Sequence, residues 1–569
     1  MLTPDLLHEV ELGVWKSLLE HLMRMLHTRG PHATATFDTR FRQITSYPPD
    51  TIRKFSHNVS GMKKLAARDY EDILQCCGPC FEGLFLEEDD IHIQQLIFTM
   101  AHWHALAKLR VHTTTTIASH YDTVETDCEH EARKRVEIRH ALATGNAAQS
   151  TESGKRAVKF NLTTYKLHSL GDYPEAIEMF GTTDSYSSQI GELEHRRAKS
   201  HARRSNQARL VESVSDMDHR QSYIVQRGHL LSKFEKHIRE EQKTSIESNS
   251  TDSMERGELT DSYALTEHHT IGARGETMHI RRFMEQNAGD PALVDFLPNL
   301  KNYFLVCFGI SPAENLLFSE LQRQQIVIPS GTLVRHATCQ VSYTTYDVRR
   351  TQDTVNPRTK HHFIMTRNQD DNPDHPFWYA KVIGIYHANV LHLGLHTQAP
   401  RRIEFLWVRW LELAEVGGWD LCRMDRIAYT NSNSTIDSFG FIDPATVIRS
   451  CHLIPSFKYY QATKPAAPSI SYDDQLEGDW SHYYVNRFVD RDMAVRYMPG
   501  VGIGHLNATS HSEVYDTESM DVDELEPTSH EPHLNAGQDP TYDSANDQDD
   551  FETRSHASYD SICEEQYDL

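Results

Sequence analysis

The stretch Ile190–Arg204, I-G-E-L-E-H-R-R-A-K-S-H-A-R-R, combines two carboxylates with a cluster of basic residues. Read as a helix, it places Glu194 on the apolar face and Glu192 on a second face that suits solvent. A carboxylate on the packed side of a helix, beside a basic surface, suits a metal-dependent enzyme that acts on nucleic acid. The alternative is a solvated helix with Glu194 at its margin, because charge runs usually face water.

The overall composition predicts a soluble, intracellular protein of several domains. The chain has 569 residues, of which 38% are hydrophobic, and its nine cysteines are scattered as expected for reduced thiols. No apolar run approaches the ~20 residues that span a bilayer, and the N-terminus lacks a signal-peptide pattern. Cys77-Gly-Pro-Cys80 has the spacing of redox and zinc motifs, but without a second pair it favours core packing.

The net charge of −24 is concentrated at the C-terminal end. From Leu506 to Leu569 there are 18 acidic residues and one basic residue, Arg554, which leaves 63 acidic and 56 basic residues for the rest of the chain. This tail has few apolar residues and no periodicity. We therefore expect it to be disordered.

Hydrophobic periodicity predicts an α+β fold. Apolar residues recur at helical spacing in the first half of the chain, beginning close to Thr3 and Pro4. β-branched and aromatic runs separated by turn residues follow in the second half. We expect a helical region at 1–245, a linker at 246–275, a short helical connector at 276–325, a β-rich sheet or barrel at 326–500 and a disordered acidic tail at 501–569.

Six runs of the β-rich region predict strands, and later segments should close the sheet. The runs are Gln325–Val334, Thr338–Val348, His362–Arg367, Trp378–His387, Arg402–Leu411 and Leu421–Ile427. Their aromatic residues, beside Arg402, Arg409 and Lys381, could form a stacking surface for nucleic acid. The alternative is that these aromatic residues pack in the core.

A series of phrases, in order from about residue 4 to 505, carries a family resemblance. They include P-D-L-L-H-E-V-E-L-G-V-W-K (Pro4–Lys16), F-N-L-T-T-Y-K-L-H-S-L-G-D-Y (Phe160–Tyr173), G-T-T-D-S-Y-S-S-Q-I-G-E-L-E-H-R-R-A-K (Gly181–Lys199), F-W-Y-A-K-V-I-G-I-Y (Phe377–Tyr386) and F-L-W-V-R-W (Phe405–Trp410). Together they resemble the Plavaka-type transposases of mushroom-forming fungi, a branch of the CACTA-like cut-and-paste DNA transposons.

The resemblance implies an RNase H-like core in which two Asp and one Glu hold Mg²⁺. Hard divalent cations prefer oxygen ligands, and two such ions can drive in-line attack on a phosphate. Asp5-Leu-Leu-His8 resembles the D-x-x-H signature that follows the second catalytic Asp, and residues of roughly 11–160 would form a helical insertion. Glu194 would be the catalytic Glu and a metal ligand, with Glu192 as the second choice.

One departure from the family pattern affects the expected activity. Met1 lies only four residues before Asp5, so we expect an N-terminally truncated core that lacks the strands bearing the first and the second Asp. Glu194 would bind metal only if the missing Asp residues were present. Because loss of a metal ligand costs catalysis many orders of magnitude, we expect neither DNA cleavage, strand transfer nor bound Mg²⁺ in this chain.

The resulting expectation is a nuclear, transposon-derived protein that retains DNA binding. The DNA, either non-specific or transposon ends, would contact a basic segment comprising Arg196, Arg197, Lys199, Arg203 and Arg204. One alternative is a non-catalytic chromatin or protein interaction module. Another is a fragment of a longer, active DDE transposase whose gene model is incomplete. Neither a membrane nor a small-molecule cofactor is expected as a partner.

Overall fold

The structure is a computed structural model and describes one compact unit of the chain, Met1–Ala508, in part. The residues described are 3–47, 51–62, 65–123, 160–189, 191–192, 199, 201–202, 209–247, 268–312, 318–368, 376–394, 399–430, 438–459, 469–472 and 479–498. The expected disordered tail and most of the expected linker lie outside these ranges and stay predictions.

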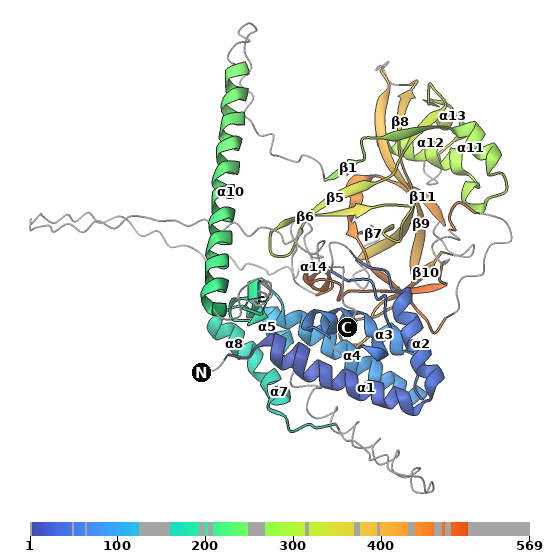
Figure 1. Ribbon diagram of the computed structural model, residues 1–569. Helices are drawn as coiled ribbons and strands as arrows, with labels where there is room; N and C mark the ends of the chain where they lie inside the picture. Colours follow the sequence, from blue (N-terminus) through green and yellow to red (C-terminus); the bar gives the residue numbers. More distant parts are fainter. Residues whose placement is uncertain are drawn as a thin grey trace, which may run out of the picture. The chain divides into compact units, whose positions relative to one another are not determined.

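Helices and antiparallel sheets together confirm the α+β class (Figure 1). A ten-residue π-helix, η1 (Leu6–Trp15), continues into α1 (Lys16–Thr28), which ends just before Gly30. The further helices of the N-terminal region are α2 (Pro31–Gln43), α3 (Ala67–Phe81), α4 (Glu87–Ala107), α5 (Thr114–Thr123), α7 (Tyr165–His168), α8 (Tyr173–Phe180) and α10 (Leu210–Glu247).

Two long antiparallel strands, β8 (Phe377–His392) and β9 (Arg401–Glu415), form the centre of an 11-stranded sheet. Its other strands are β2 (Gly275–His279), β3 (Ile326–Val327), β4 (Thr332–His336), β7 (Phe363–Arg367), β10 (Arg426–Tyr429), β11 (Phe439–Ile442), β12 (Val447–Ser450), β13 (Leu453–Pro455) and β14 (His482–Val485). A second sheet has the order β1 (His269–Ile271), β5 (Cys339–Thr344), β6 (Arg350–Val355). The helices of this region are α11 (Ile280–Gln286), α12 (Phe296–Cys307), α13 (Glu320–Gln324) and α14 (Arg491–Arg496).

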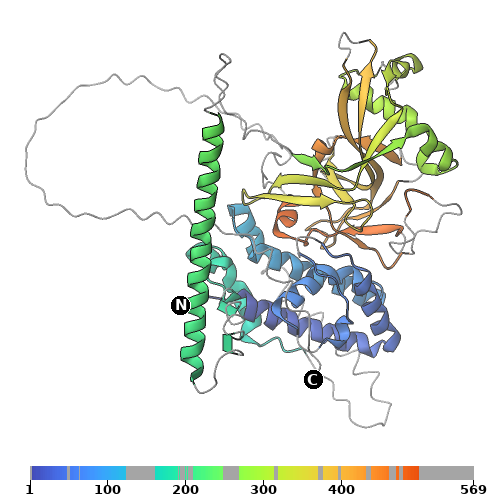
Figure 2. The same ribbon diagram turned by 45° about the horizontal axis from the view of Figure 1, so that its top comes forward.

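The central strands are buried on both faces, which explains their nearly continuous apolar sequence. On one face, Phe405 and Trp407 of β9 pack with Phe296 of α12. On the other, Leu406 and Val408 share a core with the three-stranded sheet. Figure 2 shows the helices around α12 beside one end of the long strands. The expected strand at Leu421–Ile427 is wrong over its first part, which is a turn in which Cys422 has φ 47°.

The helical region and the large sheet share one hydrophobic core. Trp15 and Trp103, both fully buried helical residues, belong to the same cluster as Tyr379, Leu411 and further residues of the sheet. A shared core means that the two regions stabilise each other. Unfolding of one should therefore expose apolar surface of the other.

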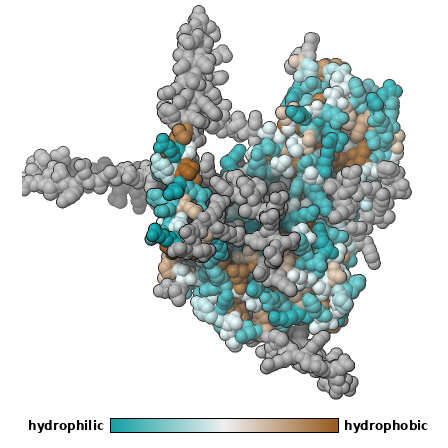
Figure 3. All heavy atoms as spheres, in the orientation of Figure 1, coloured by the Kyte–Doolittle hydropathy of each residue, from teal (hydrophilic) through white to brown (hydrophobic). Residues whose placement is uncertain are grey.

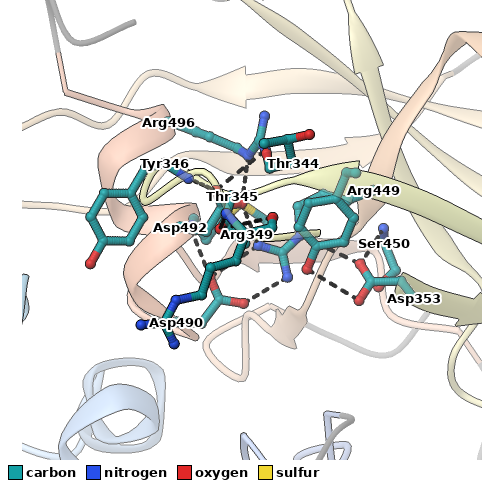
Figure 4. A network of polar contacts seen from close by, with 12 residues as sticks. Thr344, Thr345, Tyr346, Arg349, Asp353, Arg449, Ser450, Asp490, Asp492 and Arg496 are labelled. Carbon is teal, nitrogen blue, oxygen red and sulfur yellow. Dashed lines mark hydrogen bonds and ion pairs between the residues drawn. The ribbon is translucent and has the colours of Figure 1, made fainter. Parts of the chain in front are cut away.

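Arg449 of β12 is the centre of a buried polar network (Figure 4). Its Nη1 lies 2.9 Å from Asp492 Oδ2, and its Nη2 lies 2.6 Å from Asp490 Oδ2. Its Nε lies 3.4 Å from Asp353 Oδ2, while Nη2 also donates to the hydroxyl of Tyr47 at 3.3 Å. Tyr47 comes from the helical region, so this network is a second connection between the two regions.

Candidate functional site

Asp5, at the start of η1, holds the segment that contains Ser188. Its Oδ1 accepts the backbone N–H of Ser188 at 3.0 Å, and its Oδ2 accepts the Ser188 hydroxyl at 2.5 Å. One turn along η1, His8 Nδ1 lies 2.5 Å from the same Oδ2. Asp5 and His8, the pair of the D-x-x-H signature, therefore contact Ser188. This serine lies 183 positions after Asp5 and shortly before Glu192.

Glu192 completes this group, which we call the Asp5 cluster: Asp5, His8, Ser188 and Glu192. The Nε2 of His8 lies 3.9 Å from Glu192 Oε1, and the Glu192 side chain is 47% exposed. Burial raises the pKa of Asp5, but hydrogen bonds from Ser188 and His8 outweigh burial and lower the pKa below its ordinary value. Asp5 is therefore a stable carboxylate at neutral pH.

The Asp5 cluster does not fit nucleophilic hydrolysis. In a Ser-His-Asp triad the hydroxyl and the carboxylate use opposite nitrogens of the imidazole ring. Here Asp5 Oδ2 and Ser188 Oγ both approach Nδ1 of His8, at 2.5 and 3.0 Å. His8 therefore cannot take a proton from Ser188 while Asp5 orients its other nitrogen.

The Asp5 cluster also does not fit the Mg²⁺ site that the resemblance implies. Each oxygen of Asp5 already faces two partners, because Oδ2 contacts the Ser188 hydroxyl and His8, while Oδ1 accepts the Ser188 N–H and lies 3.5 Å from the Ser187 hydroxyl. The imidazole of His8 also contacts the carboxylate of Glu192. Mg²⁺ needs carboxylate lone pairs in near-octahedral geometry. Within the described ranges, Asp5 and Glu192 belong to no group of three closely spaced metal-ligand side chains.

A different group in the described part of the chain could hold a metal ion. Glu11 of η1, Glu71 of α3 and His104 of α4 are buried, and one ligand atom of each lies within 4.8 Å of the others. However, Lys108 Nζ lies 3.3 Å from Glu11 Oε1 and 2.7 Å from Glu71 Oε1. The ammonium group already supplies a cation to both carboxylates, so a metal ion would have to displace it.

Most residues expected to bind metal or DNA lie outside the described ranges: Glu194, Arg196, Arg197, Arg203 and Arg204. The expectation that Glu194 lies on the apolar side of a helix stays a prediction. Glu192, expected on the solvent face, is exposed, and so is Lys199. Ser188 was not expected at the site, although Gly181–Ser188 is rich in Gly, Ser, Thr and Asp, a composition that signals a turn with side-chain hydrogen bonds.

Lys381, Arg409 and Arg402 are engaged within the protein. Lys381 is buried and donates to Asp479 at 2.7 Å. The Arg409 guanidinium lies 3.8 Å from the centre of the Tyr429 ring, and Arg402 pairs with Glu404 at 2.7 Å. These contacts favour the interpretation that this group stabilises the fold.

No protein-family model, curated protein or solved structure matches this chain. The family resemblance is therefore a proposal that depends on the quoted phrases and on the geometry above. Within the described residues, no helix is both long enough and apolar enough to cross a membrane.

We expect Asp5→Asn to release the Ser188 segment. The amide cannot accept the same charge-assisted hydrogen bonds, so the free energy of unfolding should fall by about 1–2 kcal/mol at neutral pH. Because the folded state lowers the pKa of Asp5, this difference should be present above pH 3.8, the ordinary pKa, and vanish as the pH falls through the folded value.

Urea unfolding measures this difference, and hydrogen exchange at the Ser188 amide gives a local readout. Exchange should become about tenfold faster, equivalent to ~1.4 kcal/mol. Asp172→Asn, at an exposed aspartate, is the matched control and should change neither quantity. Equal exchange at Ser188 in the wild type and in Asp5→Asn would contradict the role of Asp5 as an anchor.

Proposed function

We propose that this chain is a nuclear, transposase-derived protein that binds DNA through its basic segment and does not cleave DNA by itself. The Asp5 cluster carries this proposal. The resemblance assigns Asp5 and His8 to one wall of a transposase site and Ile190–Arg204, with Glu194 as first choice and Glu192 as second choice for the catalytic Glu, to another. His8 contacts both Asp5 and Glu192, and these contacts support the proposal that the chain derives from a transposase.

The charge that follows the cluster supports DNA binding. Lys199 is exposed, and so are Arg209, Arg220 and Arg227 at the start and along the first half of α10. Exposed cations that follow Glu192 in the sequence are suited to contact DNA phosphates. Because the phosphates are the same in all DNA, such contacts bind DNA of any sequence. The poor fit of the Asp5 cluster to Mg²⁺ supports the absence of cleavage.

A filter-binding titration with duplex DNA over a range of salt concentrations tests the proposal. Replacing Arg196, Arg197, Lys199, Arg203 and Arg204 by Gln should weaken binding similarly for all sequences. It should also reduce the slope of log affinity against log salt by ~0.9 for each phosphate that the variant no longer neutralises.

A control variant carries the same change of charge at exposed positions elsewhere: Arg29, Lys54, Arg274, Arg281 and Arg358 to Gln. If the control loses as much affinity as the basic-segment variant, binding is not specific to that segment. Wild-type protein that binds no DNA at low salt would refute the proposal. Nicking of supercoiled DNA in the presence of Mg²⁺ would refute the absence of cleavage.

The second candidate function is a protein or chromatin interaction module, and α10 favours it. This helix exposes apolar side chains, among them Val211 (81% exposed) and Ile224 (69%). Hydrophobic side chains are visible on the described part of α10 in Figure 3. A pulldown that recovers chromatin proteins after nuclease treatment, and loses them in Ile224→Asp, would support this function over DNA binding.

A further inference from the structure

A groove of about 800 Å³ opens in the β-rich region, lined by residues of β5, β6, β7, β8, β9, β11 and β12. Its volume falls within the range of about 300–1,000 Å³ that is typical of ligand sites. None of the lining residues belongs to the Asp5 cluster or to the basic segment. An inference about this groove therefore does not rest on the proposed function.

Two tryptophans supply planar apolar surface in the groove. Trp378 of β8 and Trp410 of β9 lie edge to face, with ring centroids 5.6 Å apart at an interplanar angle of 77°. Their strands pair so that Trp410 lies opposite Ala380, which places both indoles on one face of the sheet. Both side chains are only partly buried, so their rings are accessible from the groove.

The charge of the groove is positive, in contrast to that of the whole chain. Its described lining includes Arg350, Arg367 and Arg496 but no Asp or Glu. Arg496 is held by Asp492 at 2.7 Å. Arg350 and Arg367 are exposed, and neither forms an ion pair with a described carboxylate. Among the described residues, these two cations therefore face the groove without an ion-pair partner.

We propose that this groove binds single-stranded nucleic acid. Bases would stack on Trp378 and Trp410, and phosphates would pair with Arg350 and Arg367. Aromatic platforms flanked by unpaired cations are the combination by which proteins bind single strands without sequence preference. An acidic peptide would satisfy the arginines but would leave the paired indole surfaces without planar partners. Duplex DNA is a poorer ligand for the two indoles, because its bases are already stacked on one another.

Fluorescence anisotropy of a labelled oligothymidylate, with the full chain at low salt, tests the proposal. Trp378→Ala should weaken binding about 5- to 100-fold, the range for removal of one base-stacking interaction. Trp378→Phe keeps an aromatic face and should retain most of the affinity. Arg350→Gln combined with Arg367→Gln should reduce the salt slope by about 1.4, at ~0.7 for each phosphate on a single strand.

Arg358→Gln is the matched control, because this exposed arginine of the same region lies outside the groove. It should leave affinity unchanged. The arginine variants change only exposed side chains, so they decide the matter if Trp378→Ala does not fold. Equal binding of a duplex, equal binding of a Glu/Tyr copolymer, or an equal effect of Arg358→Gln would overturn the proposal. The basic-segment variant should still bind oligothymidylate, which separates this site from the proposed duplex-DNA site.

Discussion

Arg449→Met should lower the free energy of unfolding by about 3–5 kcal/mol. The guanidinium is 1% exposed and pairs with Asp353, Asp490 and Asp492. Methionine fills similar space but leaves these carboxylates without their shared cation. Burial raises the pKa of Asp353, and Arg449 offsets only part of this. At Asp490, Arg449 together with the Met493 N–H and Arg496 outweighs burial and lowers the pKa. Removal of Arg449 therefore destabilises both charged groups.

Urea unfolding monitored by far-ultraviolet circular dichroism and by tryptophan fluorescence measures this effect. Because Arg449 also contacts Tyr47 and because the helices share a core with the sheet, both signals should change in one transition. Arg423→Met is the control, since Arg423 is 46% exposed and pairs with Glu415 at the surface. It should cost no more than ~1 kcal/mol. A similar small loss for Arg449→Met would contradict a structural role for the network.

The sequence predicted the positions of helices and strands better than it predicted which side chains contact one another. Apolar spacing located α1 because this helix buries one face, through Leu18, Leu22 and Leu26, and apolar runs located β8 and β9 because both strands are apolar on two faces. No feature of the sequence around Arg449 predicted that this residue is the centre of a buried polar network. Its partners come from positions 47, 353, 490 and 492, and such a set forms only when the sheet and the helices have packed.

The candidate site shows the same limit. The family resemblance selected Asp5, His8 and Glu194, with Glu192 as the second choice. Glu194 lies outside the described residues, and Asp5, His8 and Glu192 lie together. It gave no indication that Ser188 would occupy both oxygens of Asp5. Whether both oxygens of a carboxylate accept hydrogen bonds depends on how two segments of the chain pack against each other. Neither composition nor periodicity specifies that packing.

Lys108→Met should cost about 3–5 kcal/mol at neutral pH, because it leaves the carboxylates of Glu11 and Glu71 buried without their ammonium partner. In the wild type, burial raises the pKa of Glu71, but Lys108, Arg68 and His104 together outweigh burial and hold the pKa well below 4.5, the ordinary value. That group therefore contributes stability above about pH 4.5, and this contribution disappears as the pH falls through the folded pKa.

In the variant, Arg68 still pairs with Glu71 at 3.1 Å, but loss of Lys108 raises the pKa of Glu71 relative to the wild type, so acid protonates the carboxylate more readily and reduces the penalty. The difference between wild type and Lys108→Met should consequently be largest near neutral pH and shrink below pH 4.5, the ordinary pKa of the group. Lys54→Met, at an exposed lysine, should change stability little at either pH. A deficit that is independent of pH would mean that Lys108 acts through packing of its alkyl chain and not through charge.

The same variant tests whether Lys108 occupies the position of a metal ion. Without the ammonium group, Glu11, Glu71 and His104 offer two oxygens and one nitrogen, a ligand set that suits Zn²⁺ better than Mg²⁺. Zn²⁺ at one hundred times its dissociation constant should stabilise Lys108→Met by ~2.7 kcal/mol and leave the wild type unchanged. Adding His104→Ala to the variant should abolish the response. Stabilisation of the wild type by Zn²⁺ would show that this cluster is a metal site despite Lys108.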